Sequence, residues 1–291
     1  MKWKGREQSR NIDDRRSGGG ARKVGAGIGI GGLIVVILGL LMGGDPQQLL
    51  QQLQGSGGIG AEQAPSTEGI QQTGREDDAM AEFVAVVLKD TEDAWVQIFR
   101  EEFNEKYPQP TLVLFSEQDQ SACGFASAAT GPFYCPADNQ IYIDLSFAND
   151  LKTRFKAPGE FAMAYVVAHE VGHHVQNIMG ISGKVHQQKQ RLSKAEANDL
   201  SVRLELQADF FAGLWAHYTQ DMKGVIDAAD IEAAMKAASA IGDDRLQMEA
   251  QGYTVPDAFT HGTSEQRTRW FRKGWDTGDI KQGDTFAAKK L

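Results

Sequence analysis

The apolar residues of this chain form one long uninterrupted run near its start and shorter, periodic patterns further on. Residues 24–44, VGAGIGIGGLIVVILGLLMGG, contain no charged side chain. About 20 predominantly apolar residues suffice to cross a bilayer as a helix, so this run predicts a single transmembrane helix over residues 24–44. A cleaved signal peptide is the alternative, but the long basic start and the lack of a clear small-residue cleavage site favour an uncleaved anchor.

Residues 45–78 separate this run from the part of the chain that has periodic patterns. They are rich in Gln and Gly and poor in aromatic residues. Such a composition is typical of flexible tethers, because it offers little apolar surface to bury. We therefore expect a flexible linker over residues 45–78 and a folded domain over residues 79–291.

The domain begins with a mixed helix and strand pattern and continues with helices. Apolar residues at helical spacing predict a helix over residues 81–103, and two short runs predict strands over residues 110–115 and 140–147. Four further helical patterns follow, at residues 160–180, 193–220, 230–250 and 264–275. Ser193 and Glu196 form a capping box at the start of the second of these. A small sheet followed by several helices predicts a mostly helical α+β domain.

The charge of the chain is distributed unevenly along it. The net charge is −9, but residues 1–23 hold eight basic and three acidic side chains and so carry +5. The rest carries −14, and such an acidic body is a poor match for the phosphate backbone of a nucleic acid. By the positive-inside rule, the basic cluster predicts a cytoplasmic N-terminus and a single-pass protein of the bacterial inner membrane. Residues 24–44 would contact the lipid bilayer, and the domain would be periplasmic or extracellular.

Cys123 and Cys135 are the two cysteines of the chain, in the run ACGFASAATGPFYCP. Cysteines at this spacing around Gly, Ser and Pro can close a disulfide loop in an oxidising compartment, and two unrelated thiols are the alternative. The expected location of the domain favours a disulfide between Cys123 and Cys135. Two cysteines by themselves do not supply the four ligands of a structural zinc site.

His169, Glu170 and His173 lie together in the otherwise apolar helical pattern EFAMAYVVAHEVGHHVQNIMG. Residues four apart share one face of a helix, so His169 and His173 can bind one metal ion. Glu170 points about 100° away around the helix axis, where it can act on a water rather than on the metal. This His-Glu-x-x-His pattern inside an apolar helix predicts a catalytic zinc ion with Glu170 as general base.

A hydrolytic zinc ion has three protein ligands and one position for water, so the third ligand comes from elsewhere in the chain. The helical run RLELQADFFAGLWAHY contains Glu205 and Asp209, which border an apolar stripe. Two carboxylates there are costly without a partner. We interpret Glu205 as the third ligand and Asp209 as the acceptor of the other N–H of His169. Asp209 and His217 are the alternative ligands, and the solvated edge of an amphipathic helix is the non-functional interpretation.

The remaining histidines have less defined predictions. His174 lies around the helix from the second ligand, where we expect packing or a hydrogen bond rather than metal binding. His186 lies in a polar loop and is expected to be solvated. His261 precedes a predicted helix and is a catalytic candidate for stabilising an oxyanion, with Arg267 bracing it, although a structural contact fits its position equally well. Two tyrosines are weaker candidates for the same role, Tyr218 and Tyr253.

Several motifs together resemble a known family. HEVGHH with a downstream ELQAD is similar to the gluzincin branch of zinc metallopeptidases, whose second motif has the form Glu-x-x-x-Asp. KWKGREQSRNIDDRR, the apolar run, GPFYCPADNQIYIDL, AHEVGHHVQ, LELQADFFAG and HGTSEQRTRWF resemble the bacterial membrane-anchored neutral zinc metallopeptidase family of the YpfJ type. The resemblance covers nearly the whole chain apart from the linker. It implies a zincin-like fold and a zinc-dependent peptidase domain outside the cytoplasm.

The sequence therefore predicts a membrane-anchored zinc metallopeptidase that cleaves peptide bonds of a protein or peptide substrate with a metal-activated water. Zinc would be held by His169, His173 and Glu205, while Glu170 takes the proton and passes it to the leaving amine. Two alternatives stay open: a zinc-binding but non-proteolytic membrane scaffold, and a zinc amidase acting on cell-wall peptides. Glu170 argues against the scaffold, because a purely structural zinc site has no use for that carboxylate.

Overall fold

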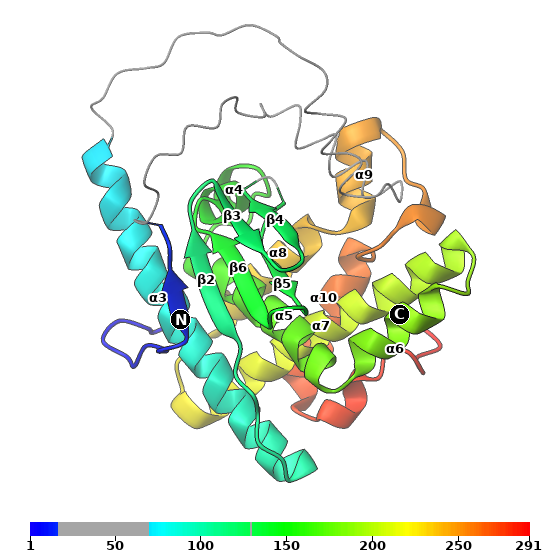
Figure 1. Ribbon diagram of the computed structural model, residues 1–291, viewed down its shortest axis with the longest axis horizontal. Helices are drawn as coiled ribbons and strands as arrows, with labels where there is room; N and C mark the ends of the chain where they lie inside the picture. Colours follow the sequence, from blue (N-terminus) through cyan, green and yellow to red (C-terminus); the bar gives the residue numbers. More distant parts are fainter. Residues whose placement is uncertain (17–69, 129) are drawn as a thin grey trace, which may run out of the picture.

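The computed structural model describes residues 1–16, 70–128 and 130–291 (Figure 1). The predicted transmembrane helix at residues 24–44 lies outside the described residues, as does most of the predicted linker at residues 45–78. Within the described ranges, no helix combines the length and the apolar character that crossing a membrane requires.

The described residues form a small sheet and a larger set of helices. The strands are β1 (Ile12–Asp14), β2 (Thr111–Phe115), β3 (Gln118–Ser121), β4 (Gly124–Ser127), β5 (Phe133–Cys135) and β6 (Gln140–Asp144). The helices are α3 (Ile70–Ile98), α4 (Phe147–Thr153), α5 (Glu160–Ile178), α6 (Ile181–Lys189), α7 (Lys194–Lys223), α8 (Ala228–Ala240), α9 (Asp243–Gln251) and α10 (Ser264–Thr277). A π-helical turn, η1 (Phe99–Phe103), extends α3. The predicted α+β class with mostly helical content is confirmed.

Four strands form a mixed sheet in the order β1-β2-β6-β5. The first three are parallel, with Ile12 opposite Leu112 and Leu112 opposite Ile141. β5 pairs antiparallel with β6 and forms one edge of the sheet. Leu114 and Ile143 are buried in the same core as the helices, as expected for parallel strands, which need covering elements. β3 and β4 form a separate two-stranded hairpin.

α5 is the central helix of the domain and carries the His-Glu-x-x-His pattern. It is apolar around most of its circumference because α3, α7, α8 and β5 pack against it. Figure 1 shows α5 between the sheet and the later helices α7 and α10. The predicted apolar helix at residues 160–180 is therefore confirmed, and its burial explains why polar side chains on it need partners.

α7 and α10 cross at a very short distance because each has a glycine at the crossing point. A Cβ atom on Gly213 would lie 1.9 Å from the carbonyl oxygen of Phe271, and one on Gly274 would lie 2.1 Å from that of Phe210. A larger residue at either position would push the two helices apart. The close crossing holds the first turn of α10, with Arg267, against the middle of α7.

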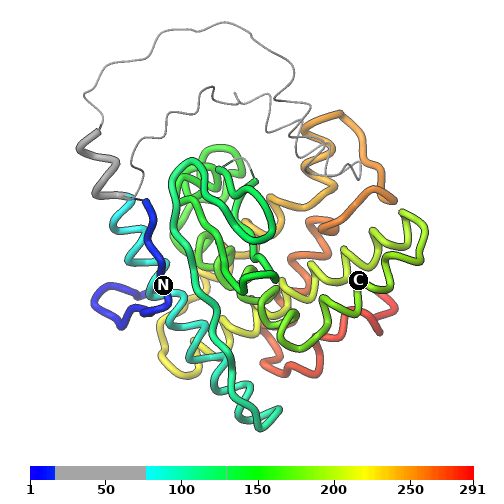
Figure 2. Tube along the Cα trace, in the orientation of Figure 1, coloured from blue at the N-terminus to red at the C-terminus, as the bar shows by residue number. Residues whose placement is uncertain are grey.

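Residues 1–16 pack against the domain, and Figure 2 shows this first part of the chain along α3. β1 joins the sheet beside β2. Trp3 is 7% exposed, and its ring lies 5.5 Å from the ring of Phe83 on α3. These contacts place residues 1–16, the described part of the predicted basic N-terminal segment, against the domain.

Three local predictions differ from the structure. α3 begins at Ile70, within the predicted linker. The helix predicted over residues 230–250 is two helices, α8 and α9, because the chain turns at Gly242, where a Cβ atom would lie 2.4 Å from the backbone nitrogen of Ser264. The polar stretch around His186 is not a loop but belongs to α6.

Other local predictions agree with the structure. The capping box of Ser193 and Glu196 is present at the start of α7. The strand predicted over residues 110–115 is β2, apart from its first residue. The strand predicted over residues 140–147 is β6, which ends at Asp144 because α4 follows directly.

Candidate metal centre

Three side chains from α5 and α7 meet at one point of the domain. His169 and His173 lie one turn apart on α5, and Glu205 faces them from α7. The carboxylate of Glu205 lies 3.2 Å from Nε2 of His169 and 3.4 Å from Nε2 of His173. The three potential ligand atoms lie within 4.8 Å of one another. The structure thus brings together the residues that the sequence pattern indicates as metal ligands.

The spacing of these atoms fits a zinc ion. Zinc binds imidazole nitrogen and carboxylate oxygen in a tetrahedron at about 2.0–2.2 Å, so its ligand atoms lie roughly 3.3 Å from one another. Both contacts of Glu205 have nearly this length. Two imidazoles and one carboxylate are also the donor set of hydrolytic zinc sites that keep one position for water. The chemistry and spacing of these side chains therefore fit zinc.

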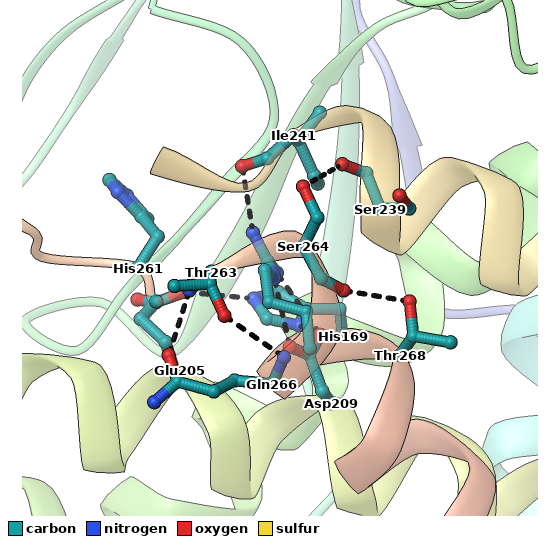
Figure 3. Close-up of polar contacts among 12 residues, drawn as sticks. His169, Glu205, Asp209, Ser239, Ile241, His261, Thr263, Ser264, Gln266 and Thr268 are labelled. Atoms are coloured by element: carbon teal, nitrogen blue, oxygen red, sulfur yellow. Dashed lines mark hydrogen bonds and ion pairs between the residues drawn. The ribbon is translucent and has the colours of Figure 1, made fainter. Parts of the chain in front are cut away.

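Asp209 fixes the orientation of His169 (Figure 3). Its carboxylate lies 2.9 Å from Nδ1 of His169 and accepts the proton there, so the lone pair of Nε2 faces Glu205. Asp209 is fully buried and also accepts hydrogen bonds from Nε of Arg267 at 2.8 Å and from the hydroxyl of Tyr165 at 2.5 Å. Such outer partners orient metal-binding histidines and raise their basicity.

His173 has a corresponding partner within α5. Oε1 of Gln176 lies 2.9 Å from Nδ1 of His173 and accepts its proton. The amide group of Gln176 donates to the carbonyl of Leu204 at 2.6 Å and to Gln207 at 3.2 Å, which fixes its orientation. Sequence reasoning missed Gln176. The available signal was its position three residues after His173, on the same face of the helix.

The electrostatics of the three side chains favour a cation between them. Burial by itself raises the pKa of Glu205, but the two facing imidazoles hold it well below its usual range. Burial lowers the pKa of His169, yet Asp209 and Glu205 outweigh this effect and raise it to about 10. Burial also lowers the pKa of His173, and Glu205 raises it overall. The carboxylates thus attract positive charge to this point, and a bound metal ion supplies that charge in place of protons.

Glu170 lines the same cleft as the three ligands and is 8% exposed. Burial raises the pKa of Glu170, while the imidazoles of His173 and His169 and a hydrogen bond from the backbone N–H of Tyr134 partly oppose this rise. A carboxylate whose pKa is raised toward the working pH is suited to accept a proton and return it.

His261 lines the cleft from the loop before α10. Its Nδ1 lies 3.2 Å from Oδ1 of Asp243, and Oδ2 of this buried carboxylate accepts the backbone N–H groups of His261 and of both its neighbours. The side chain of His261 is 47% exposed, and Asp243 and Glu205 raise its pKa above the ordinary value. Sequence reasoning expected Arg267 to brace His261. Asp243 does so instead, because Arg267 is bound to Asp209.

The metal-binding side chains open into a cleft of about 550 Å³. The loop that contains the two cysteines provides part of its wall through Thr130, Pro132, Phe133, Tyr134 and Pro136. The predicted disulfide between Cys123 and Cys135 is present and closes this loop. The wall includes the edge strand β5, so a strand with an unpaired side borders the candidate metal centre.

His174 does not face the metal ligands. Its Nε2 lies 2.6 Å from the carbonyl oxygen of Pro108 and donates to it. Its ring makes edge contacts with the rings of Tyr107 and Tyr134, at centroid distances of 5.7 and 5.4 Å. These contacts are those of a packed, hydrogen-bonded side chain, which is the role that the sequence pattern favours for His174.

The other candidates lie away from the metal ligands. His217, an alternative ligand, has its Nδ1 2.7 Å from the carbonyl oxygen of Trp275. His186 is exposed on α6, with Nε2 3.2 Å from the amide of Gln190. The cleft lining does not include the two tyrosine candidates, Tyr218 and Tyr253.

The comparisons with known proteins agree with this geometry. The family described as "Putative neutral zinc metallopeptidase" matches residues 1–286. The chain is 48% identical over 291 residues to "Uncharacterized protein YpfJ" of Escherichia coli (strain K12), which covers 98% of this chain and 99% of that protein. It is 45% identical over 195 residues to "Uncharacterized protein Rv2575" of Mycobacterium tuberculosis (strain ATCC 25618 / H37Rv), which covers 64% and 65%. No solved structure matches the chain significantly. The chain therefore belongs to the family described as "Putative neutral zinc metallopeptidase".

Proposed function

We propose that this protein is a zinc-dependent peptidase that hydrolyses peptide bonds with Glu170 as general base. One observation carries the proposal: His169, His173 and Glu205 converge beside the buried Glu170 and open into a cleft. Structural zinc sites are closed by four protein ligands, whereas catalytic sites keep a position that substrate or water can reach.

Zinc would be held by His169, His173 and Glu205. When bound, it lowers the pKa of water and polarises the carbonyl group of the substrate. The protein prepares the ligands for this task, because Asp209 and Gln176 accept the Nδ1 protons of the two imidazoles and leave both Nε2 atoms available. The pKa of Asp209 stays low despite burial because Arg267 and His169 compensate its charge.

Glu170 would carry the proton of the reaction. Its carboxylate accepts a proton from the attacking water and then donates it to the leaving amine. The raised pKa supports this role, because it makes the carboxylate a stronger base than an ordinary glutamate. The hydrogen bond from the backbone of Tyr134 on β5 would hold the carboxylate in place during the transfer.

His261 would stabilise the negative charge that develops on the carbonyl oxygen of the substrate. Asp243 raises the pKa of His261, which favours the protonated, hydrogen-bond-donating form of the ring. Asp243 also fixes the backbone on both sides of His261, which limits the reorganisation needed during the reaction. Preorganised donors of this kind stabilise developing charge most effectively.

The substrate would bind as an extended chain along β5. This strand is the edge of the sheet and its residues Phe133 and Tyr134 line the cleft. An extended peptide can pair with such an edge through its backbone, and the pockets beside it then select side chains. This binding mode suits proteins and peptides of varied sequence.

We also propose that the domain works outside the cytoplasm. The disulfide between Cys123 and Cys135 supports this location, because disulfides persist in oxidising compartments. Contact of residues 24–44 with a lipid bilayer stays a prediction from the sequence.

The decisive experiment compares the parent protein with Glu170→Gln. We expect the variant to bind zinc as the parent does and to cleave a fluorogenic casein about 10²–10⁴ times more slowly, because only the proton transfer is lost. Glu232→Gln, a change of the same kind at an exposed position, is the matched control. Zinc content is measured by atomic absorption and cleavage by fluorescence.

The alternatives give different outcomes. If Glu170→Gln retains the activity of the parent, general-base catalysis by this residue is wrong. A parent that binds zinc but cleaves neither casein nor wall fragments would support the non-proteolytic scaffold. Cleavage of purified wall peptides without cleavage of casein would support the zinc amidase.

A further inference from the structure

A buried carboxylate on α3 finds its partners in the first residues of the chain. Glu92 is 4% exposed. It accepts hydrogen bonds from the hydroxyl of Ser9 at 2.5 Å and from the side-chain amide of Asn11 at 2.7 Å. A buried carboxylate that loses its hydrogen bonds is strongly destabilising. The fold of the domain therefore uses residues that lie more than 80 positions earlier in the sequence.

A second buried carboxylate, two residues earlier on α3, also contacts the N-terminal segment. The side chain of Asp90 is fully buried and forms an ion pair with Arg6. Lys223, at the end of α7, contacts the same oxygen at 2.8 Å. Removing one partner from a buried ion pair leaves charge uncompensated in the interior. Arg6 is thus part of a charge cluster that joins the N-terminal segment to two helices of the domain.

Trp3 connects the same segment to the helix that carries the metal ligands. Its ring is buried against Phe83. Its Nε1 donates to the carboxylate of Glu160 at 2.8 Å. Glu160 is the first residue of α5. The N-terminal segment therefore contacts α3, α5 and, through Arg6, the neighbourhood of α7.

Backbone pairing makes the segment part of the sheet. β1 pairs with β2 over the whole of its length, with Asp13 opposite Val113 and Asp14 opposite Leu114. The backbone N–H of Leu112 donates to Asn11 at 2.8 Å. Such pairs require strands about 4.8 Å apart, so no lipid layer can lie between them.

The chain leaves the domain and returns to it at neighbouring points. Arg16 is the last described residue of the N-terminal segment. Its guanidinium donates to the backbone carbonyl of Asp77 on α3 at 3.0 Å and lies 3.7 Å from the carboxylate of Asp78. Both ends of the stretch between residues 16 and 70 therefore lie on one folded body.

The charges of the two parts are complementary. Residues 1–23 carry +5, and the rest of the chain carries −14. Arg15 pairs with Asp119 of the domain at 2.7 Å, and Arg6 pairs with Asp90. Some of the basic residues that predict a cytoplasmic N-terminus thus form ion pairs with acidic residues of the domain.

We propose that residues 1–16 and residues 70–291 fold as one body in one aqueous compartment, with both on the same side of any bilayer. A single crossing leaves its two ends on opposite sides of a hydrocarbon core about 30 Å thick. The contacts of Trp3, Ser9 and β1 require both ends on the same side.

Crosslinking in cells tests the contact. The amide of Asn11 lies 2.8 Å from that of Gln109. The full chain carrying Asn11→Cys and Gln109→Cys should give an intramolecular product with a short, membrane-permeant bis-maleimide. The control pairs Asn11→Cys with Met248→Cys, at an exposed position on α9, and should give none. Failure of the Asn11–Gln109 pair to react in cells whose protein binds zinc would overturn the proposal.

Labelling of intact cells tests the compartment. Single variants Gln8→Cys and Met248→Cys place an exposed thiol on each part, and the parent with its Cys123–Cys135 disulfide measures the background. With a membrane-impermeant maleimide, we expect both variants to be labelled or both to be protected until the cells are permeabilised. Labelling of one thiol and protection of the other would sink the proposal.

Discussion

Carboxylates at two places in the helices of this protein differ in the side chains that contact them. On α3, Asp90 and Glu92 are bound by side chains of the N-terminal segment, with Lys223 adding a second cation for Asp90. At the candidate metal centre, Glu205 faces His169 and His173 instead. Asp90 receives its positive charge from Arg6 and Lys223, and Glu92 is bound by neutral hydrogen-bond donors, whereas Glu205 is arranged to receive positive charge from a metal ion.

The difference shows how a metal centre can be distinguished from a structural charge cluster. A carboxylate that meets an arginine or a lysine is already compensated, as Asp90 is. A carboxylate that meets two imidazoles whose outer nitrogens are held by Asp209 and Gln176 faces two lone pairs. Lone pairs and a carboxylate repel one another unless a cation or protons lie between them. The predictions below test this distinction from the largest expected effect to the smallest.

Glu205→Ala should have the largest effect because it removes a ligand of the proposed zinc ion. We expect loss of bound zinc and a fall in peptide cleavage of about 10³-fold or more, since metal polarisation provides several kcal/mol. Asp221→Asn changes an exposed carboxylate on the same helix and should leave both quantities unchanged. Zinc retained by Glu205→Ala after dialysis would contradict the ligand assignment.

His261→Gln should lower cleavage about 10²-fold while zinc remains bound, because the change removes a donor to the oxyanion. The pKa of His261 is raised above its ordinary value of 6.5, so the parent should lose this contribution as the pH rises through the raised pKa. The alkaline limb of the kcat/KM profile should therefore be missing in the variant. An unchanged profile would show that His261 is only a structural residue.

Asp209→Asn should weaken zinc binding about 10–100-fold, because the amide orients His169 less well and makes it less basic. The same change leaves the buried Arg267 without its anionic partner, so the unfolding temperature should also fall. Zinc titration with a competing chelator measures the first effect and calorimetry measures the second. If zinc affinity is unchanged, Asp209 acts only as a partner of Arg267.

Arg6→Met should lower the free energy of unfolding by about 1.5–3 kcal/mol, the contribution of a hydrogen bond to a charged group. Lys223 stays in contact with Asp90 and limits the loss. Zinc affinity of the folded protein should not change, which separates this cluster from the metal centre. Arg10→Met, at an exposed position of the same segment, is the control in denaturant titrations.

The pair of His261 and Asp243 should have the smallest effect, and on stability only within a pH window. Burial by itself raises the pKa of Asp243, but His261 holds it below the ordinary value of 3.8. The contribution of Asp243 to the stability of the fold is therefore present above pH 3.8, and it is lost as the pH falls through the lowered pKa. The raised pKa of His261 means that its contribution is present below pH 6.5 and disappears as the pH rises through the raised value. Melting temperatures of the parent and His261→Gln should therefore differ most between pH 3.8 and pH 6.5. They should converge below the lowered pKa of Asp243 and above the raised pKa of His261.

The sequence pattern was most informative where residues with metal-binding side chains recur at the spacing of a helix. The four-residue spacing of His169 and His173 in an apolar helix indicated a shared face, and the structure places both rings at one point. Glu205 and Asp209 could also be predicted from the sequence, because two carboxylates beside a buried stripe need partners. Helix boundaries marked by a capping residue, as at Ser193, could be predicted as well.

The sequence pattern does not predict hydrogen-bond and ion-pair partners that come from distant segments of the chain. Nothing local in the sequence shows that Asp243 holds His261, or that Arg267 reaches Asp209 through the close crossing of α7 and α10 at Gly213. Gln176 could have been found from helical spacing, but its role depends on the orientation that Leu204 and Gln207 impose.

The N-terminal segment shows the limit most clearly. Its basic residues and the apolar run after it favour a segment apart from the domain when only neighbours in the sequence are considered. In the structure, β1 pairs with β2, and Arg6 forms an ion pair with Asp90, which lies about 80 residues later in the sequence. Charge counts in a sequence do not record which charges meet, because long-range pairing is decided by the fold.

The sequence by itself determined the mostly helical α+β class, the pair of imidazoles on one helix face, the carboxylates of α7 and the loop between the cysteines. These features follow from periodicity and residue type, which act over a few neighbouring positions. Only the tertiary structure decided which side chains hold the metal-binding residues in place and where residues 1–16 lie. Those outcomes depend on contacts between distant segments, where burial makes each unpaired charge costly and leaves few arrangements in which every group has a partner.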